Sequence, residues 1–429
     1  MKALFIPYLA RFISSDGLLA FKRRLYRLRR SSVPRLTVFL RVNDPYSFVL
    51  IQALHTFRDK YSVEIDYHFV ARLQGDMYPD TAAWHKWALQ DAQALCALYR
   101  FPLPRQFPAP LDLRQLQQQA AYLESIKAPL HHVRNLFLAA FGGSEFLSEK
   151  QEFEPLFRAN EQRLKKMGHY LTGNIYCEGE WYWGVDRLGF LEQRLIDEGF
   201  ASGTPFFVKT LCNQQQWPSP VSLSRKPLIM YFSMRSPYSY LGLVLARRLC
   251  ATAQIPLEVR PVMPMVMRGM QVPDNKKMYI FSDTKRLANY YRIPYGFVAD
   301  PLGAGVERCY ALYEWAKSKG KGIRFLTAFA HGVNAEGIRA ETDKGLQRIL
   351  HTAALDWHEA QQQLHNKQWQ NWAQVNLESL QQLGFWGVPC FQYGNLAVWG
   401  HDRLWLIAEK IKLDEIQAQQ QQAENSAAE

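Results

Sequence analysis

The segment Ser236-Pro237-Tyr238-Ser239 has residue types in an order that suits it to hold a sulfur anion. It follows a short apolar run and precedes a helical pattern, which places Ser236 at the N-cap and Pro237 at the first helical position. A helix N-terminus carries a partial positive charge and unpaired N–H groups, which lower the pKa of a thiol placed there. Because the segment has no cysteine, the sulfur would come from a bound small thiol. The alternative is that Ser236 only caps the helix.

Two segments near the end of the chain could bind the rest of such a ligand. In Gly387-Val388-Pro389-Cys390, the N–H and C=O of Val388 would be exposed to an extended peptide-like ligand if the bond before Pro389 were cis, although most such bonds are trans. In Gly400-His401-Asp402-Arg403, Asp402 can accept a hydrogen bond from a ligand ammonium or cap the following helix.

The residues before these segments supply charge and apolar surface. Lys276 and Lys277 precede a predicted helix and can either meet a ligand carboxylate or form a solvated surface pair. Four apolar side chains can line a substrate pocket, although packing in the core is the more frequent role of such residues. They are Met263, Met265, Met267 and Phe281.

Two short motifs occur twice, in the same order. Pro45-Tyr46-Ser47-Phe48 recurs as Pro237-Tyr238-Ser239-Tyr240, at a spacing of 237 − 45 = 192 residues. The sequence Trp-Gly-x-Asp-Arg-Leu at 183–188 recurs at 399–404, at a spacing of 399 − 183 = 216 residues. Two motifs in register indicate a tandem duplication whose second copy has gained 216 − 192 = 24 residues.

The residue patterns predict one element order for both halves, and the fold class is therefore α/β. Each half opens βαβ, with a parallel strand pair joined by a right-handed crossover, and closes ββα after a helical insertion. The expected strands are 36–40, 63–70, 228–232, 257–262, 390–393 and 396–399, and the expected helical stretches are 49–57, 80–168, 241–249, 274–382 and 402–412.

The composition divides the chain into five parts. Residues 1–33 form a basic N-terminal segment, and 34–200 and 227–414 form the two α/β domains. Residues 201–226, which contain Gly, Pro and Ser, are the expected linker. The Gln-, Ala- and Glu-rich residues 415–429 are expected to be a disordered tail.

The positive charge is concentrated at the start of the chain. Residues 1–30 carry eight basic residues and one acidic residue, which leaves 12 − 7 = +5 of the net charge for the other 399 residues. The body therefore lacks the clustered basic residues of a nucleic-acid groove. We expect the segment to be a surface helix packed on the body; the alternatives are weak contact of a basic amphipathic helix with an anionic membrane surface, or a targeting peptide.

The cysteines exclude several classes of protein. The six cysteines are far apart, and no two are separated by only two residues, which excludes a zinc ribbon and a Cys-x-x-Cys dithiol centre. We therefore expect no bound metal and a reducing compartment, the cytoplasm. With an apolar fraction of 48% and no apolar run of transmembrane length, the chain is also neither wholly disordered nor expected to span a membrane.

The second half resembles the family of kappa-class glutathione transferases and 2-hydroxychromene-2-carboxylate isomerases, within the DsbA-like thioredoxin-fold group. The resemblance covers about residues 228–412 and implies two tandem thioredoxin-like domains with glutathione as the cofactor. The stretches that carry it are 236–241, 283–288, 293–294, 387–389 and 399–404.

The resemblance implies a role for each residue that matches the family motifs. Ser236 would hold the glutathione sulfur, and Val388, before Pro389, would bind the cysteinyl backbone. Asp402, with His401 beside it, would meet the γ-glutamyl ammonium.

The resemblance also implies a basic residue for a glutathione carboxylate, and it has two departures. Lys276 best fits that basic position, with Lys277 adjacent. A ligand-binding Asn that is common after the second strand is replaced by the segment 263–265. Cys390 follows the proline, where it either packs silently or forms a mixed disulfide.

The first half matches the expected fold but lacks the expected chemistry. Asp44 stands at the position of Ser236, and a carboxylate there would raise the pKa of a neighbouring thiol. The position of Pro389 falls on Gly173, after Thr172. The N-terminal copy is therefore expected to keep its scaffold without a glutathione site.

Three functions are compatible with these residues. The first is a glutathione-dependent isomerase or transferase that acts on a small electrophilic or aromatic substrate. The second is a non-catalytic thioredoxin-fold protein that serves as a binding module or scaffold. The third, a DsbA-like thiol-disulfide oxidoreductase, lacks the pair of cysteines that it needs. The sequence leaves the oligomeric state open.

Overall fold

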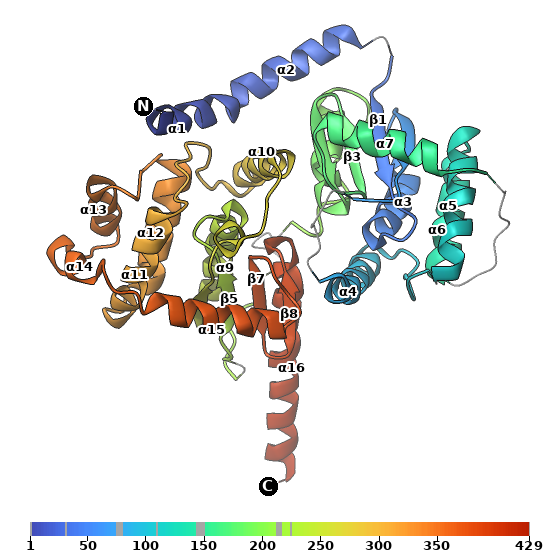
Figure 1. Cartoon of the computed structure of the whole chain (residues 1–429). Coiled ribbons are helices and arrows are strands. Elements are labelled where there is room, and N and C mark those ends of the chain that lie inside the picture. Colours follow the sequence, from blue (N-terminus) through green and yellow to red (C-terminus); the bar gives the residue numbers. More distant parts are fainter. Residues whose placement is uncertain are drawn as a thin grey trace. The chain divides into compact units, whose positions relative to one another are not determined.

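The computed structural model describes residues 2–30, 32–73, 80–108, 110–142, 151–211, 217–223 and 225–428. The chain forms two compact units (Figure 1). The N-terminal unit comprises Ala20–Thr210 and Asp274–Tyr279, and the C-terminal unit comprises Met1–Leu19, Leu211–Pro273 and Ile280–Glu429. The basic segment 1–33 is thus divided between the two units. None of the described helices is long and apolar enough to cross a membrane.

The N-terminal unit is built on a four-stranded sheet of order β2-β1-β3-β4, in which only β1 and β2 are parallel. Its strands are β1 (Arg35–Leu40), β2 (Glu64–Phe69), β3 (Asn174–Cys177) and β4 (Glu180–Trp183). Its helices are α2 (Asp16–Arg29, from Ala20 onward), α3 (Pro45–Arg58), α4 (Thr81–Tyr99), α5 (Pro110–Ser125), α6 (Leu130–Gly142), α7 (Glu154–Met167), the short η1 (Val185–Arg187) and α8 (Leu188–Asp197). Val38 and Phe39 point to opposite faces of β1 and are both fully buried, as expected of a strand covered on both faces.

The C-terminal unit has a second four-stranded sheet with the equivalent order, β6-β5-β7-β8, and again a single parallel pair. Its strands are β5 (Leu228–Phe232), β6 (Leu257–Pro261), β7 (Cys390–Tyr393) and β8 (Leu396–Trp399). Its helices are α1 (Lys2–Ile13), α9 (Pro237–Ala253), η3 (Met265–Arg268), α10 (Asp274–Tyr291, from Ile280 onward), α11 (Ala304–Ser318), α12 (Gly322–Ala335), α13 (Asp343–Thr352), α14 (Trp357–Gln363), α15 (Trp369–Gln382), η4 (His401–Arg403) and α16 (Leu404–Ala428). In both halves the structure therefore has the predicted order βαβ, helices, ββα.

The spacing of 192 residues between the halves extends beyond the motif at the first helix. The C-cap residue is Arg100 for helix α4 and Arg292 for helix α10, and both are in the left-handed conformation, with φ of 58° and 53°. These residues lie 292 − 100 = 192 positions apart. Left-handed backbone is uncommon for residues other than glycine, so this shared helix end is a specific likeness between the two halves.

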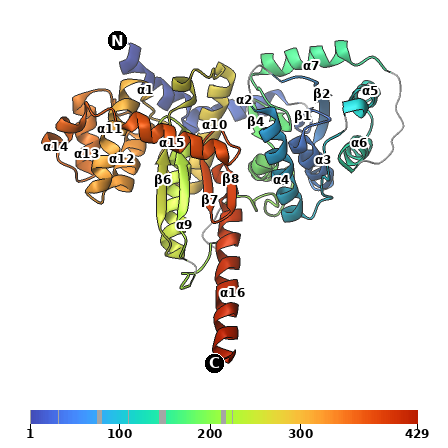
Figure 2. The ribbon, with the colours of Figure 1, turned by 60° about the horizontal axis from the view of Figure 1, so that its bottom comes forward.

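The end of the chain differs from its prediction. The expectation of a disordered tail is wrong for residues 415–428, because α16 continues through them and extends past β7 and β8 in both Figure 1 and Figure 2. Ala, Gln and Glu are strong helix formers, which favours this continuation. The Glu415 carboxylate also accepts hydrogen bonds from the backbone N–H (3.0 Å) and hydroxyl (2.8 Å) of Ser222, which hold the helix to the segment 217–223.

The first part of the expected linker packs on the N-terminal unit. The Glu192 carboxylate of α8 is fully buried and accepts hydrogen bonds from the backbone N–H groups of Phe206 (2.8 Å) and Phe207 (2.7 Å). Residues 212–216, Cys212 among them, lie outside the described residues.

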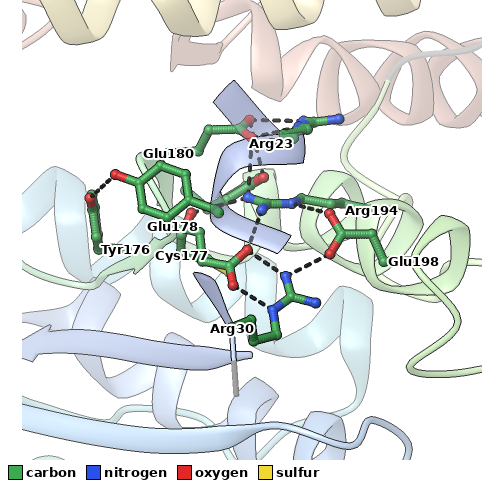
Figure 3. Close-up of polar contacts among 10 residues, drawn as sticks. Arg23, Arg30, Tyr176, Cys177, Glu178, Glu180, Arg194 and Glu198 are labelled. Carbon is green, nitrogen blue, oxygen red and sulfur yellow. Dashed lines mark hydrogen bonds and ion pairs between the residues drawn. The ribbon is translucent and has the colours of Figure 1, made fainter. Parts of the chain in front are cut away.

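Six charged side chains meet at the turn between β3 and β4 of the N-terminal unit (Figure 3). They are Arg23, Arg30, Arg194, Glu178, Glu180 and Glu198. Arg194 is at the centre, and its side chain is only 2% exposed. Its guanidinium lies 2.6 Å from the carboxylate of Glu178, 3.1 Å from that of Glu180 and 3.0 Å from that of Glu198.

The two other arginines of this cluster hold helix α2 and its C-terminal end to the unit. Arg23 binds Glu180 through two nitrogens at 2.7 and 2.9 Å, and Arg30 lies 2.7 Å from Glu198. Although burial alone acts to raise it, hydrogen bonds from Arg30 and Arg194 hold the pKa of Glu198 below its ordinary value of 4.5. The cluster therefore stabilises the fold while these carboxylates are ionised.

Replacing Arg194 by Ala is expected to lower the free energy of unfolding by about 3–5 kcal/mol, because three half-buried carboxylates lose their buried central partner. The pKa of Glu198 is lower in the folded protein than its ordinary value. The part of the stability loss that comes from Glu198 is therefore fully present at pH values above the ordinary pKa, and it disappears as the pH falls through the pKa of the folded protein. Urea unfolding followed by circular dichroism, repeated at falling pH, measures both effects.

Arg35→Ala is the matched control, since Arg35 forms an exposed pair with Glu64 at 2.9 Å. Such a pair contributes about 0–1 kcal/mol. Equal losses from both substitutions would contradict the role given to Arg194.

Candidate functional site

Helix α9 begins at the predicted motif, and its N-cap is Ser236. The Oγ of Ser236 accepts a hydrogen bond from the backbone N–H of Ser239 at 3.1 Å, and Pro237 occupies the first helical position. The predicted cap is thus confirmed. The cap uses the hydroxyl only as an acceptor, which leaves its proton to be donated elsewhere. Ser236, Pro237 and Tyr238 are half-buried, so this helix start is partly open to solvent.

Strand pairing brings a second predicted segment to the same end of the sheet. Tyr231, next to last in β5, is paired with Cys390, the first residue of β7. Pro389, just before β7, therefore lies at the carboxyl end of β5, which leads into α9. The bond between Val388 and Pro389 is cis. Val388 is half-buried, so its backbone lies beside a partly accessible surface.

The turn after β8 joins this group through the backbone. The N–H of Gly400 donates to the carbonyl oxygen of Pro389 at 2.9 Å. The buried ring of His401 lies 5.5 Å from the ring of Tyr238, and its Nε2 is 3.4 Å from a carboxylate oxygen of Asp402. The side chain of Asp402 is 15% exposed. One end of the sheet thus gathers Ser236, Val388, Pro389, His401 and Asp402.

Asp402 lies in the short turn η4, which precedes α16. The cap residue of this turn is Gly400, which has no side chain, and Asp402 lies inside the turn. Arg403 is buried and donates a hydrogen bond to the carbonyl oxygen of Asp402 at 3.2 Å. Arg187 makes the equivalent bond to the carbonyl oxygen of Asp186 in the N-terminal unit, at 3.4 Å.

Lys276 and Lys277 lie in the first turns of α10, which belong to the N-terminal unit. The Lys276 ammonium lies 5.4 Å from the centre of the Tyr170 ring, and burial lowers its pKa. Lys277 pairs with Asp274 at 2.9 Å on the surface. This agrees with the alternative of a solvated surface pair.

The region after β6 contains a cation that the sequence analysis did not single out. Arg268, in η3, donates from Nη2 to the carbonyl oxygen of Trp386 at 2.8 Å, two residues before Val388. Burial lowers the pKa of its guanidinium, and no carboxylate within the described residues pairs with it. The only sequence signal was an arginine in an otherwise apolar turn. The four predicted pocket residues, Met263, Met265, Met267 and Phe281, are all half-buried.

The tyrosine of each Pro-Tyr-Ser motif donates a hydrogen bond to a buried carboxylate. The sequence did not reveal either of these two hydrogen bonds. The Tyr238 hydroxyl donates to Asp283 of α10 at 2.7 Å, and the Tyr46 hydroxyl donates to Asp91 of α4 at 2.9 Å. Both pairs are separated by 45 residues in sequence. Arg286 adds an ion pair to Asp283 at 3.0 Å. These bonds fix the first turn of α3 and of α9 against the following long helix.

At the equivalent site of the N-terminal unit, the helix start already holds an anion. The Asp44 carboxylate accepts hydrogen bonds from the backbone N–H groups of Tyr46 and Ser47, both at 3.2 Å. The hydroxyls of Ser47 (2.7 Å) and Thr172 (2.8 Å) also donate to it. Asp44 is 3% exposed, and Pro45 is buried as well. The residues that replace Ser236 and Val388 thus bind one another.

The cysteine after the cis proline is not accessible. Cys390 is fully buried, its Sγ donates to the carbonyl oxygen of Gly387 at 3.1 Å, and burial raises the pKa of its thiol well above the ordinary value. The silent-packing alternative is confirmed. The other four described cysteines, Cys96, Cys177, Cys250 and Cys309, are buried too. No group of three side chains within the described residues is arranged to hold a metal ion.

Known proteins are similar in sequence to the C-terminal half of the chain. Residues 227–412 match the family described as DSBA-like thioredoxin domain. A 2-hydroxychromene-2-carboxylate isomerase from Sphingobium xenophagum is 26% identical over 187 residues, which cover 42% of this chain and 94% of that protein.

Two solved structures are similar to this chain over less than half of its length, at low identity. A 2-hydroxychromene-2-carboxylate isomerase structure is 19% identical, covers 45% of this chain and 98% of its own, and has a TM-score of 0.40. The structure of the cytosolic disulfide reductase DsbM from Pseudomonas aeruginosa with GSH is 16% identical and has a TM-score of 0.33. The match covers 44% of this chain and 99% of that chain. The C-terminal half of the chain contains a DsbA-like thioredoxin domain, and 2-hydroxychromene-2-carboxylate isomerase is its distant homologue.

Proposed function

We propose that the C-terminal unit binds glutathione at the start of α9 and uses it in a glutathione-dependent isomerisation or transfer. The name of the homologue from Sphingobium xenophagum supports the isomerase class. The substrate would be a small electrophilic or aromatic compound. The reducing cytoplasm is the compartment that suits the five buried free cysteines.

The observation that carries the proposal is the difference between the two helix starts. Both supply the partial positive charge of a helix N-terminus. At α3 that charge is neutralised by the buried carboxylate of Asp44, which accepts four hydrogen bonds. At α9 the corresponding side chain is the neutral, half-buried hydroxyl of Ser236. An external anion therefore has a favourable position at α9 and an occupied one at α3.

The residues around Ser236 have the chemistry that a γ-glutamyl tripeptide needs. The peptide groups of Val388 can pair with an extended backbone, and the carboxylate of Asp402 can accept from an ammonium. His401 lies between Asp402 and Tyr238 and limits the space around them. Arg268 is a half-buried cation near the same loop and can attract a negatively charged group of the substrate.

When bound, glutathione supplies a sulfur nucleophile that adds reversibly to a conjugated electrophile. The chain holds that sulfur ionised: the Ser236 hydroxyl donates to it, and the amide dipoles of α9 act along the same direction. The bond between Tyr238 and Asp283 keeps the first turn of α9 in place, and the half-buried methionines of η3 offer an apolar wall to a ring.

We further propose that the two units arose by tandem duplication and that the N-terminal copy has lost its site. The equal sheet orders, the paired left-handed helix ends and the two tyrosine–aspartate pairs support the duplication. The competing hypothesis, a non-catalytic binding module or scaffold, predicts that the chain is not retained on immobilised glutathione. Retention of the chain on immobilised glutathione would favour the glutathione-dependent enzyme over the binding module or scaffold.

Ser236→Ala is expected to raise the thiol pKa of bound glutathione by about 1–2 units, because a hydrogen bond to a charged group contributes about 1.5–3 kcal/mol. Titration of thiolate absorbance near about 240 nm measures this, since thiolate formation is the pKa effect involved. Thr342→Ala is the matched control. Thr342 also caps a helix of the C-terminal unit by accepting from a backbone N–H at 3.1 Å, so its loss tests capping alone.

The control variant should lose some stability while its glutathione titrates as in the unmodified chain. An unchanged titration in Ser236→Ala, or an equal shift in Thr342→Ala, would contradict the role of Ser236.

One glutathione is expected to bind per chain. Asp402→Asn should weaken the affinity by about tenfold or more, since it removes one charge from an ammonium contact. Asp44→Asn should leave both the affinity and the stoichiometry unchanged. Isothermal titration calorimetry measures both the affinity and the stoichiometry. Two glutathione molecules bound per chain would refute the loss of the N-terminal site.

A further inference from the structure

Helices α1 and α2 carry an unusual share of the exposed apolar surface. Within the described part of the chain, nine large apolar side chains that are exposed to solvent lie between residues 5 and 28, and the most exposed of them is Leu28, at 74%. They are Phe5, Ile6, Tyr8, Leu9, Phe12, Ile13, Phe21, Leu25 and Leu28. Single exposed apolar residues are ordinary, but a row of them along one helix face marks an interaction surface.

In α1 the packed and the exposed side chains lie on opposite faces. Pro7 is buried in the C-terminal unit. The rings of Tyr8 and Phe297 are 5.2 Å apart, the Arg11 guanidinium lies 5.6 Å from the centre of the same ring, and Ser14 lies against Gly296. These positions follow one helical face. The opposite face is exposed, and it consists of Phe5, Ile6, Leu9, Phe12 and Ile13.

Helix α2 has the same division, with charge added. Arg23, and Arg30 just after the helix, point toward the carboxylates of the β3–β4 turn (Figure 3). Phe21, Leu25 and Leu28 follow one another at spacings of four and three residues, which places them in one row on another face.

The basic residues of α2 that take no part in the ion-pair cluster flank this apolar row. They are Lys22, Arg24, Arg27 and Arg29. All four are exposed, and no carboxylate of the described residues pairs with them. An apolar row bordered by basic residues on both sides is typical of a helix that lies in the headgroup region of a membrane.

We propose that α1 and α2 bind the surface of an anionic phospholipid bilayer. The apolar rows enter the boundary between headgroups and acyl chains, and the four unpaired cations of α2 meet lipid phosphates. Charge complementarity favours this partner over a second copy of the chain, because a copy would bring two basic rows together. The ion pairs of Arg23 and Arg30 anchor α2 to its own unit and leave its outer face to the membrane.

The test is co-sedimentation of the full chain with vesicles that contain phosphatidylglycerol, compared with vesicles of phosphatidylcholine alone. We expect binding to the anionic vesicles that weakens as salt is added. Arg24→Glu with Arg27→Glu should lower the partition coefficient by at least about 25-fold, since each basic residue near the surface contributes about fivefold. Phe5→Gln with Phe12→Gln should lower it by at least about tenfold.

Matched controls change exposed residues on other helices. Val375→Gln removes an apolar side chain that is 62% exposed on α15, and Arg247→Glu with Arg324→Glu reverses two exposed charges. These variants should bind like the unmodified chain, and circular dichroism should show that every variant is folded.

The proposal is overturned if the unmodified chain does not sediment with anionic vesicles at low salt, or if the α1 and α2 variants bind as well as the controls. It is also overturned if Phe5→Gln with Phe12→Gln abolishes self-association of the chain while vesicle binding is unaffected, since the exposed face of α1 would then serve a second copy. Glutathione binding is measured separately, because neither helix contributes a residue to the proposed glutathione site.

Discussion

The account depends on one electrostatic constraint, that the N-terminus of a helix has room for a single anion. In the N-terminal unit that anion is part of the chain, the Asp44 carboxylate, which is 3% exposed and accepts bonds from two amides and two hydroxyls. A second anion would meet a like charge and donors that are already used. In the C-terminal unit Ser236 caps the helix without a charge, so its side chain leaves the partial positive charge of the α9 N-terminus unneutralised.

The surrounding structure keeps this helix start in a defined position. The sheet places Pro389 beside the carboxyl end of β5, and the bond from Gly400 to Pro389 brings in the turn that carries Asp402. The buried bond between Tyr238 and Asp283 ties the first turn of α9 to α10. The N-terminal unit repeats the tyrosine–aspartate bond around a helix start whose ligand position is filled, which indicates that the bond serves the scaffold first.

Much of this arrangement could be predicted from the sequence because it depends on local patterns. Apolar runs and the Ser-Pro and Asp-Pro pairs marked β1, β5 and the starts of α3 and α9, and the repeated motifs gave the equivalent element order. The bonds from Tyr238 and Tyr46 could not be predicted, since their partners lie 45 residues away and only tertiary packing brings them together. Arg268 was missed for the same reason, because its partner is a backbone carbonyl of a distant loop.

Two predictions from composition differ from the structure: the disorder of the C-terminal tail and the basic N-terminal residues as one separate segment. Residues 415–428 continue α16, held by the bonds between Ser222 and Glu415. The basic segment is shared by two units, because Arg23 and Arg30 pair with half-buried carboxylates in one unit while Tyr8 and Arg11 pack on Phe297 in the other.

The most direct test is a crystal structure of the chain soaked with glutathione. The account predicts density for the sulfur within hydrogen-bonding distance of the Ser236 hydroxyl, and none at the start of α3. Density for the sulfur beside Asp44, or a helix start at α9 covered by side chains with glutathione bound elsewhere, would contradict it.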